Sequence, residues 1–391
     1  MGSKQNKKKK FEANYETNLD NYLSEEEFET NNIPSGFQTE LLRKLKLKED
    51  ENILISPLSI YLALALTANG GVGETQESIL KVLEDGNIDI EGVNSKCMKY
   101  LKLANDESKN FSIANAIFTM VKPTKEFKRL ATEDYEAMID KLTDDVKPIN
   151  EWCKEKTNGK ISQILNEVPG GCPMILLNAV YFLGQWQRKF SENKTLKNEK
   201  FFKANKEVKE VDLMFQTLDR VEYYEDKNVQ VINLPYSDDI SALIILPNKN
   251  FNSTISKISD NDIKSYIDSL DYCNVHLYLP KFKIEYSSKL KEQLSDMGMG
   301  ICFKNADFSK ITDEVKLVID DVIHKTYMEV NEKGTEAAAV TAVVCRAEAS
   351  IVKLKTPKKY YTMKVNRPFI FCIKHISMDQ LMFISAVQKV A

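Results

Sequence analysis

Residues 330–343 (VNEKGTEAAAVTAV), near the C-terminus, constrain the fold more than any other part of this chain. Gly334 is a backbone pivot that can adopt almost any φ and ψ, and most of the residues after it are small or β-branched. If this segment formed a strand, its side chains would alternate between two faces. One face would carry only small, uncharged side chains, those of Thr335, Ala337, Ala339 and Thr341. The pattern therefore predicts a loop that can also become a central strand of a sheet.

Five further motifs lie elsewhere in the chain. They are residues 52–60 (NILISPLSI), 149–161 (INEWCKEKTNGKI), 178–186 (NAVYFLGQW), 234–236 (LPY) with 243–247 (LIILP), and 366–371 (NRPFIF). Together with the first segment they resemble, in the same order, the motifs of the serpin family, and the match runs from about residue 34 to the C-terminus. The resemblance implies a fold with three β-sheets, surrounding helices and an exposed reactive-centre loop at about residues 332–365.

The periodicity of the chain agrees with a mixed α+β fold. Phe37, Leu41, Leu42 and Leu45 have helical spacing, and residues 58–67 have the composition of a buried helix. Helical patterns dominate before residue 170, and apolar runs typical of strands become frequent after it. The runs that predict strands are residues 111–119, 175–182, 275–279 and 369–373.

The first 33 residues differ from the rest in composition. Lysines at positions 7–10 are followed by a series of acidic residues, and such segregated charge predicts a solvated, flexible extension. Residues 34–391 are then one serpin domain. The Met1-Gly2 start also fits a myristoylation signal, but position 6 is Asn rather than Ser or Thr.

Composition and motifs argue against several classes of function. The net charge of −3 gives no general electrostatic reason to bind nucleic acid, and no apolar run reaches the length of a membrane span. We find no nucleophile elbow, phosphate-binding loop or zinc-protease motif among the residues. The three histidines, His276, His324 and His375, form no local pattern with a nucleophile or a metal-ligand set. We therefore expect neither an enzyme nor a bound cofactor or metal.

The cysteines and the start of the chain predict a location in the cell. The seven cysteines are scattered, odd in number and without a closely spaced pair, which is typical of reduced thiols. The N-terminus has no apolar stretch behind its charges and is not a secretory signal. We expect a cytoplasmic protein, and the alternative is an extracellular one that leaves the cell by an unconventional route.

The serpin resemblance implies a mechanism and a set of site residues. Members of the family inhibit proteases as suicide substrates, because the cleaved loop inserts into the main sheet and traps the acyl-enzyme. The inhibitory hinge pattern (residues 332–339, called the hinge below) falls on Glu332, Gly334, Thr335, Ala337, Ala338 and Ala339. The region where the sheet opens falls on Ser56, Asn178, Trp186 and His324.

The reactive bond is assigned by counting along the loop. Inhibitory serpins usually place seventeen residues from the hinge glutamate to the residue before the cleaved bond. The seventeenth residue from Glu332 is Glu348, which predicts cleavage between Glu348 and Ala349 and a target protease that cuts after acidic residues. The alternative is Arg346, which would suit a trypsin-like protease and would leave a shorter inserting arm.

Other functions and partners remain as alternatives. A non-inhibitory serpin could act as a carrier, chaperone or storage protein, although its hinge would usually contain charged, bulky or proline residues. The target could also be a cysteine protease rather than a serine protease. Lys96, Lys99 and Lys102 share a helical face and could bind a polyanion, but a solvated helix face is the simpler interpretation.

Overall fold

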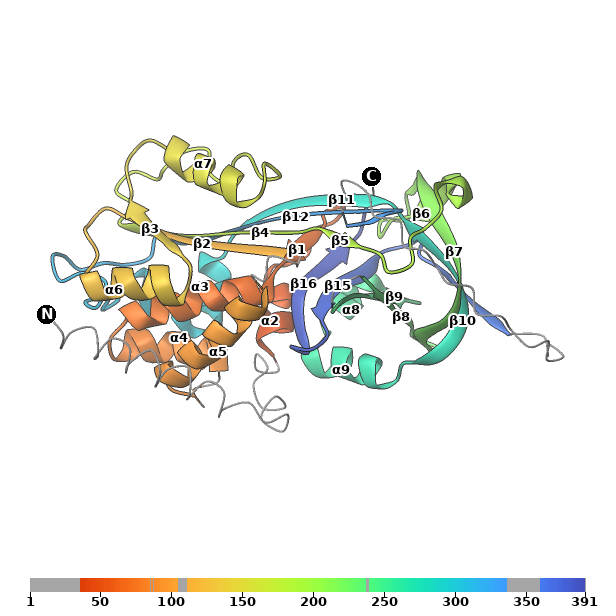
Figure 1. Cartoon of the computed structure of the whole chain (residues 1–391), viewed down its shortest axis with the longest axis horizontal. Coiled ribbons are helices and arrows are strands. Elements are labelled where there is room, and N and C mark those ends of the chain that lie inside the picture. Colours follow the sequence, from red (N-terminus) through yellow and green to blue (C-terminus); the bar gives the residue numbers. More distant parts are fainter. Residues whose placement is uncertain are drawn as a thin grey trace, which may run out of the picture.

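The structure, a computed structural model, describes residues 36–84, 86, 88–104, 111–236, 239–335 and 359–390. In this part of the chain helices and strands are mixed, which confirms the α+β class (Figure 1). Figure 1 shows a long sheet running across the molecule, with helices beneath one end of it and a second, strongly curved sheet beneath the other end.

The long sheet has seven strands among the described residues, with β11 paired to the outer side of β12. In spatial order they are β3 (Met138–Lys141), β2 (Phe111–Thr119), β4 (Met174–Phe182), β12 (Asp321–Asn331), β13 (Gly334–Thr335) and β5 (Gly184–Gln185), with β11 (Phe282–Lys289) beside β12. The two central strands β4 and β12 are parallel and pair from Asp321 with Ile175 to Tyr327 with Tyr181. Any strand added to the centre of this sheet must separate that pair.

Strand β4 is buried along its whole length because both faces of the sheet are covered. Leu176 and Val180 belong to the larger core, which includes α3, whereas Ile175 and Leu177 pack in a smaller cluster with Trp152 of α7. This alternation has the period of two that a strand requires. Figure 1 accordingly shows α7 on the opposite side of the sheet from α3.

Helix α3 (Pro57–Gly70) lies against the sheet and confirms the predicted buried helix. Pro57 occupies the first helical position, and the Ser56 hydroxyl accepts a hydrogen bond from the Ser59 backbone N–H at 3.4 Å. Both features are typical of a helix N-terminus. The helix is apolar around most of its circumference, which fits its burial between other elements. Its N-terminus therefore lies inside the molecule, next to the central strands.

The second sheet contains nine strands within the described residues. They are β1 (Ile53–Ile55), β16 (Gln380–Val387), β15 (Phe369–His375), β9 (Ile240–Pro247), β8 (Val229–Pro235), β7 (Val208–Glu225), β10 (Asp271–Pro280) and β14 (Tyr360–Lys364) in spatial order, with β6 (Leu196–Phe202) paired to β7. The resemblance implied three sheets in total. Hydrogen bonding unites two of them here, because the 18-residue strand β7 pairs with β6 and β10 over one half and with β8 over the other.

The helices have the following bounds: α2 (Phe37–Lys44), α4 (Glu74–Glu84), α5 (Ile90–Ala104), α6 (Lys125–Arg129), α7 (Lys147–Lys156), α8 (Phe251–Ile255), α9 (Asp260–Asp268) and α10 (Lys291–Leu294). Short π-helical turns at Leu130–Asp134 and Ser295–Met299, and 3₁₀ turns at Glu192–Lys194 and Gly300–Phe303, complete the set. None of the helices that the structure describes has the length and apolar character to cross a membrane.

Candidate functional site

His324 lies at the centre of the seven-stranded sheet, on β12, and is fully buried. Its Nε2 accepts a hydrogen bond from the Ser56 backbone N–H at 3.1 Å, at the start of α3. Its Nδ1 therefore carries the proton and donates to the Asn178 side-chain oxygen on β4. The two bonds connect both central strands to the N-terminus of a buried helix.

Asn178 extends this connection across the sheet. It lies directly opposite His324 on β12 and opposite Asn115 on β2. Its side-chain N–H group donates to the Asn115 side-chain oxygen at 2.6 Å and also to the Ser59 hydroxyl. A row of polar groups thus runs through an otherwise apolar interior, with their partners inside the protein.

Burial lowers the pKa of His324 to about 3, because a charged imidazolium would lose its hydration. The imidazole is therefore neutral at physiological pH, and both of its nitrogens are engaged in hydrogen bonds. Such a group suits the holding of strands in register. The three residues Ser56, Asn178 and His324, predicted for the region where the sheet opens, are brought together here.

The first described residues of the hinge already form part of the sheet. Gly334 and Thr335 make up β13, which pairs with β12 on one side and with β5 on the other. Gly334 has φ 145°, and a Cβ atom there would lie 2.0 Å from the Gly184 carbonyl oxygen. Both the backbone conformation and the close approach of β5 require glycine at this position.

Thr335 faces inward, as the alternation predicted for it, and is fully buried. Its hydroxyl shares a 2.7 Å hydrogen bond with the Tyr236 hydroxyl. Burial raises the pKa of Tyr236, which keeps the phenol protonated. The Tyr236 ring stacks on Trp186, with a centroid distance of 4.2 Å and an interplanar angle of 14°. The hinge therefore enters a pocket of aromatic side chains.

Trp186 belongs to this hinge cluster and not to the His324 cluster. Its indole N–H donates to the Asn331 carbonyl at 2.9 Å, and its backbone N–H donates to the Lys333 carbonyl at 3.1 Å. Thr335 is opposite Val330, six residues along β12 from His324, which is roughly 20 Å at the rise of a strand. The residues expected to control sheet opening are therefore divided between two places on the same seam.

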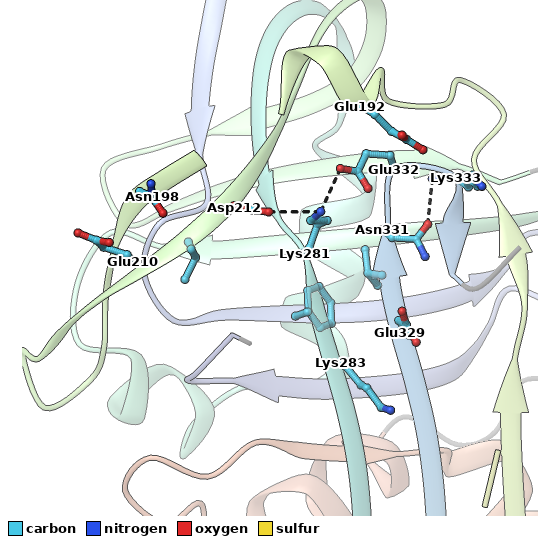
Figure 2. A pocket seen from close by; sticks show the side chains of 13 residues that line it. Glu192, Asn198, Glu210, Asp212, Lys281, Lys283, Glu329, Asn331, Glu332 and Lys333 are labelled. Carbon is cyan, nitrogen blue, oxygen red and sulfur yellow. Dashed lines mark hydrogen bonds and ion pairs between the residues drawn. The ribbon is translucent and has the colours of Figure 1, made fainter. Parts of the chain in front are cut away.

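Glu332, at the turn between β12 and β13, is held by an ion-pair network (Figure 2). The Thr195 hydroxyl donates to its carboxylate at 2.8 Å, and the Lys281 Nζ lies 3.3 Å from it and 3.4 Å from Asp212. Burial alone would raise the pKa of Glu332, but the Thr195 hydrogen bond and the Lys281 charge outweigh it and lower the pKa. We call these residues the Glu332 network. It fixes the start of the hinge to β11 and β7.

The remaining predicted hinge and loop residues lie outside the described residues. These are Ala337, Ala338, Ala339, Arg346, Glu348 and Ala349. The charged extension at residues 1–33 also lies outside them. The predicted reactive bond and the role of the extension therefore stay predictions.

The lysine face suggested for a polyanion is wrong with respect to Lys96. Its side chain is buried and pairs with Glu84 of α4 at 2.9 Å, whereas Lys99 and Lys102 on the same helix are exposed. Helical spacing placed the three lysines on one face but did not show that this face meets α4. Lys96 therefore cannot take part in a surface site for polyanions.

Several residues of the site were not predicted. Tyr236 lies in the motif at residues 234–236, and its tyrosine could have suggested a buried hydroxyl that needs a partner. Asn115 interrupts an apolar strand pattern, which is a signal for a buried polar partner. Lys281 and Thr195 carry no local signal, because they meet Glu332 only through the fold.

Comparison with known proteins agrees with this geometry. The family model for Serpin (serine protease inhibitor) matches residues 32–390. Leukocyte elastase inhibitor of Xenopus tropicalis is 32% identical over 374 residues, covering 89% of this chain and 96% of the relative. Iripin-1 of Ixodes ricinus is 31% identical over 374 residues, covering 90% of this chain and 93% of the relative.

Solved structures give the same result. The native state of the thermophilic serpin tengpin has a TM-score of 0.81 and 35% identity, covering 91% of this chain and 92% of that chain. Thyroxine-binding globulin in complex with thyroxine has a TM-score of 0.81 and 25% identity, covering 93% of this chain and 100% of that chain. With a family model that spans most of its length and relatives of this similarity, the chain belongs to the serpin family.

Proposed function

We propose that the chain inhibits serine proteases as a suicide substrate. The observation that carries this proposal is the position of β13, where Gly334 and Thr335 are already inserted between β12 and β5. Thr335 is uncharged and fully buried, and the small residues that follow it in the sequence would continue along the same seam. Insertion would therefore extend a strand that has already begun.

The proposed chemistry takes place at the bond between Glu348 and Ala349. The protease serine oxygen attacks the Glu348 carbonyl carbon, and an ester to the protease forms as the C–N bond to Ala349 breaks. The serine proton passes through the protease's own base to the leaving amine of Ala349. The ester must then survive until the loop has moved, so insertion has to be faster than hydrolysis of the ester.

Insertion would replace the β4–β12 pairing with two new ladders. About a dozen inserting residues would gain hydrogen bonds on both sides and lose one existing ladder, a net gain on the order of 10 kcal/mol. The hydrogen bonds that His324 makes to Asn178 and Ser56 cross this seam. We therefore assign to these residues the role of holding the sheet closed until the loop is cut.

The test is the number of inhibitor molecules consumed for each protease molecule inhibited. Thr335→Arg would place a charge at a fully buried position, at a cost of several kcal/mol if it remained unpaired, and should convert the protein largely into a substrate. Lys333→Arg introduces the same side chain at an exposed hinge position and should behave as the wild type. An unchanged stoichiometry in Thr335→Arg would refute the insertion mechanism.

The alternatives from the sequence are a non-inhibitory carrier, chaperone or storage protein, and an inhibitor of cysteine proteases. Heat stability after a single cut in the loop separates the first from our proposal, because an inserting loop raises stability sharply. A protease panel that includes papain-like enzymes separates the second. A cytoplasmic location is also part of the proposal, and it is supported by the six free cysteines among the described residues.

A further inference from the structure

A second pocket, which we call the Trp186 pocket, lies between the segment that follows β5 and the strands β7, β8 and β10. Its volume is about 440 Å³, which lies in the range of small-molecule sites. Its buried apolar lining comprises Trp186, Phe190, Leu218, Val221 and Leu234.

Two large apolar side chains of this pocket are open to solvent. Tyr272 is 58% exposed and Ile376 is 50% exposed, which makes them two of the more exposed large hydrophobic residues in the described part of the chain. They come from separate elements, the start of β10 and the turn between β15 and β16. Exposed apolar groups that gather around a cavity are typical of a binding surface.

The charges of the pocket favour an anion. The Arg188 guanidinium donates to the Asp219 carbonyl at 2.9 Å, and the Arg220 guanidinium lies 5.0 Å from the centre of the Tyr272 ring. Within the described residues neither arginine forms an ion pair. The acid that lines the pocket, Glu222, already accepts a hydrogen bond from the Asn233 amide at 2.7 Å.

The backbone at Arg220 is unusual. This residue has φ 55°, in the left-handed region that non-glycine residues rarely occupy. It lies at an irregularity where β7 and β10 lose register between Cys273 and Val275. Bulges of this kind redirect a side chain, and here the result is a guanidinium beside the exposed Tyr272 ring.

We propose that the Trp186 pocket binds a small anionic amphiphile. Its aromatic body would pack between Trp186, Tyr272 and Ile376. Its carboxylate or sulfonate would be bound by Arg188 and Arg220, since guanidinium groups form strong charge-assisted hydrogen bonds with such anions. This inference does not depend on the proposed inhibitory function.

Binding in this pocket is coupled to the hinge through Trp186. The same indole that lines the pocket donates to the Asn331 carbonyl and stacks on Tyr236, the hydrogen-bond partner of Thr335. A ligand packed against Trp186 stabilises the arrangement in which these contacts are made. It therefore slows any rearrangement of the hinge that breaks them.

The test titrates the full chain with anilinonaphthalene sulfonate, an anionic dye, and in parallel with phenylnaphthylamine, which has the same rings and no charge. We expect the sulfonate to bind saturably at one site and more tightly than the neutral dye. Arg220→Asn removes the charge, and asparagine tolerates the left-handed backbone. It should weaken sulfonate binding about tenfold or more and leave the neutral dye unaffected.

Lys206→Asn is the matched control. It removes one exposed cation, also at a left-handed position with φ 69°, in the turn between β6 and β7 and outside the pocket. Ile376→Glu, at an exposed turn position, is a second pocket variant and should repel the sulfonate. Failure of the wild type to bind the sulfonate saturably at millimolar dye would overturn the proposal. Equal sulfonate affinity in the Arg220→Asn and Lys206→Asn proteins would also overturn it.

Discussion

Replacement of Gly334 by alanine tests whether the hinge enters the sheet as the structure places it. The new Cβ atom would lie 2.0 Å from the Gly184 carbonyl oxygen and 2.7 Å from the Gln185 Cα. Both neighbours are backbone atoms of β5, so no side chain can rotate away to relieve the contact. The backbone at Gly334, with φ 145°, is also strained for any residue with a Cβ.

The magnitude follows from these two effects. Strain in the backbone contributes about 1–2 kcal/mol, and the forced separation of β13 from β5 contributes about 1–3 kcal/mol. We therefore expect Gly334→Ala to reduce the free energy of the first unfolding transition by about 2–5 kcal/mol. Equilibrium unfolding in urea, followed by circular dichroism, measures this change.

Gly170→Ala provides the matched control. Gly170 has an ordinary φ, and a Cβ atom there would have no neighbour within 4 Å. Its substitution should change stability by no more than about 0.5 kcal/mol. If the Gly334→Ala and Gly170→Ala proteins unfold at the same urea concentration, the pairing of β13 with β5 is not as described.

Three further predictions concern buried polar groups. Glu332→Gln should destabilise the protein at neutral pH by about 1–2 kcal/mol, a modest value because the Lys281 side chain is 34% exposed. The folded pKa of Glu332 is lowered, so its contribution is present above the unfolded pKa and is lost as pH falls through the folded value; a difference from wild type that stays constant during acid titration in urea would contradict this. His324 has a folded pKa of about 3, below its ordinary value of 6.5, so the unfolded state binds the proton first and stability falls by about 1.4 kcal/mol per pH unit between these values. His324→Gln should remove this component of the pH profile, and an identical profile in the variant would disprove its origin in His324. Lys96→Ala leaves Glu84 buried without its cation and should cost about 3–5 kcal/mol, whereas Lys99→Ala on the exposed face should change stability by no more than about 0.5 kcal/mol; thermal unfolding of the two variants checks this, and similar melting temperatures would count against the buried pair.

Local patterns predicted the main elements well. Residues 111–119 and 58–67 have the composition of a strand and a buried helix, and they form β2 and part of α3. Alternation also placed Thr335 on the inward face, where it is buried. These predictions succeeded because each depends only on neighbours within a few residues along the chain.

Contacts between distant segments could not be predicted in the same way. The hydrogen bond between Tyr236 and Thr335 joins residues 99 positions apart, and Lys281 reaches Glu332 from a different strand. The error at Lys96 has the same origin. Helical spacing identifies the residues that share a face, but the burial of that face depends on Glu84, which a separate helix supplies.

The central claim is that cleavage of the loop traps a protease. The most direct measurement mixes the protein with glutamate-specific, trypsin-like, chymotrypsin-like, elastase-like and papain-like proteases and analyses the products on denaturing gels. Mass spectrometry of the released C-terminal peptide identifies the cleaved bond. We predict a complex that resists denaturation with the glutamate-specific serine protease, and a released peptide that begins at Ala349. Cleavage by every protease without any such complex, in a product that gains no heat stability, would contradict the proposed mechanism.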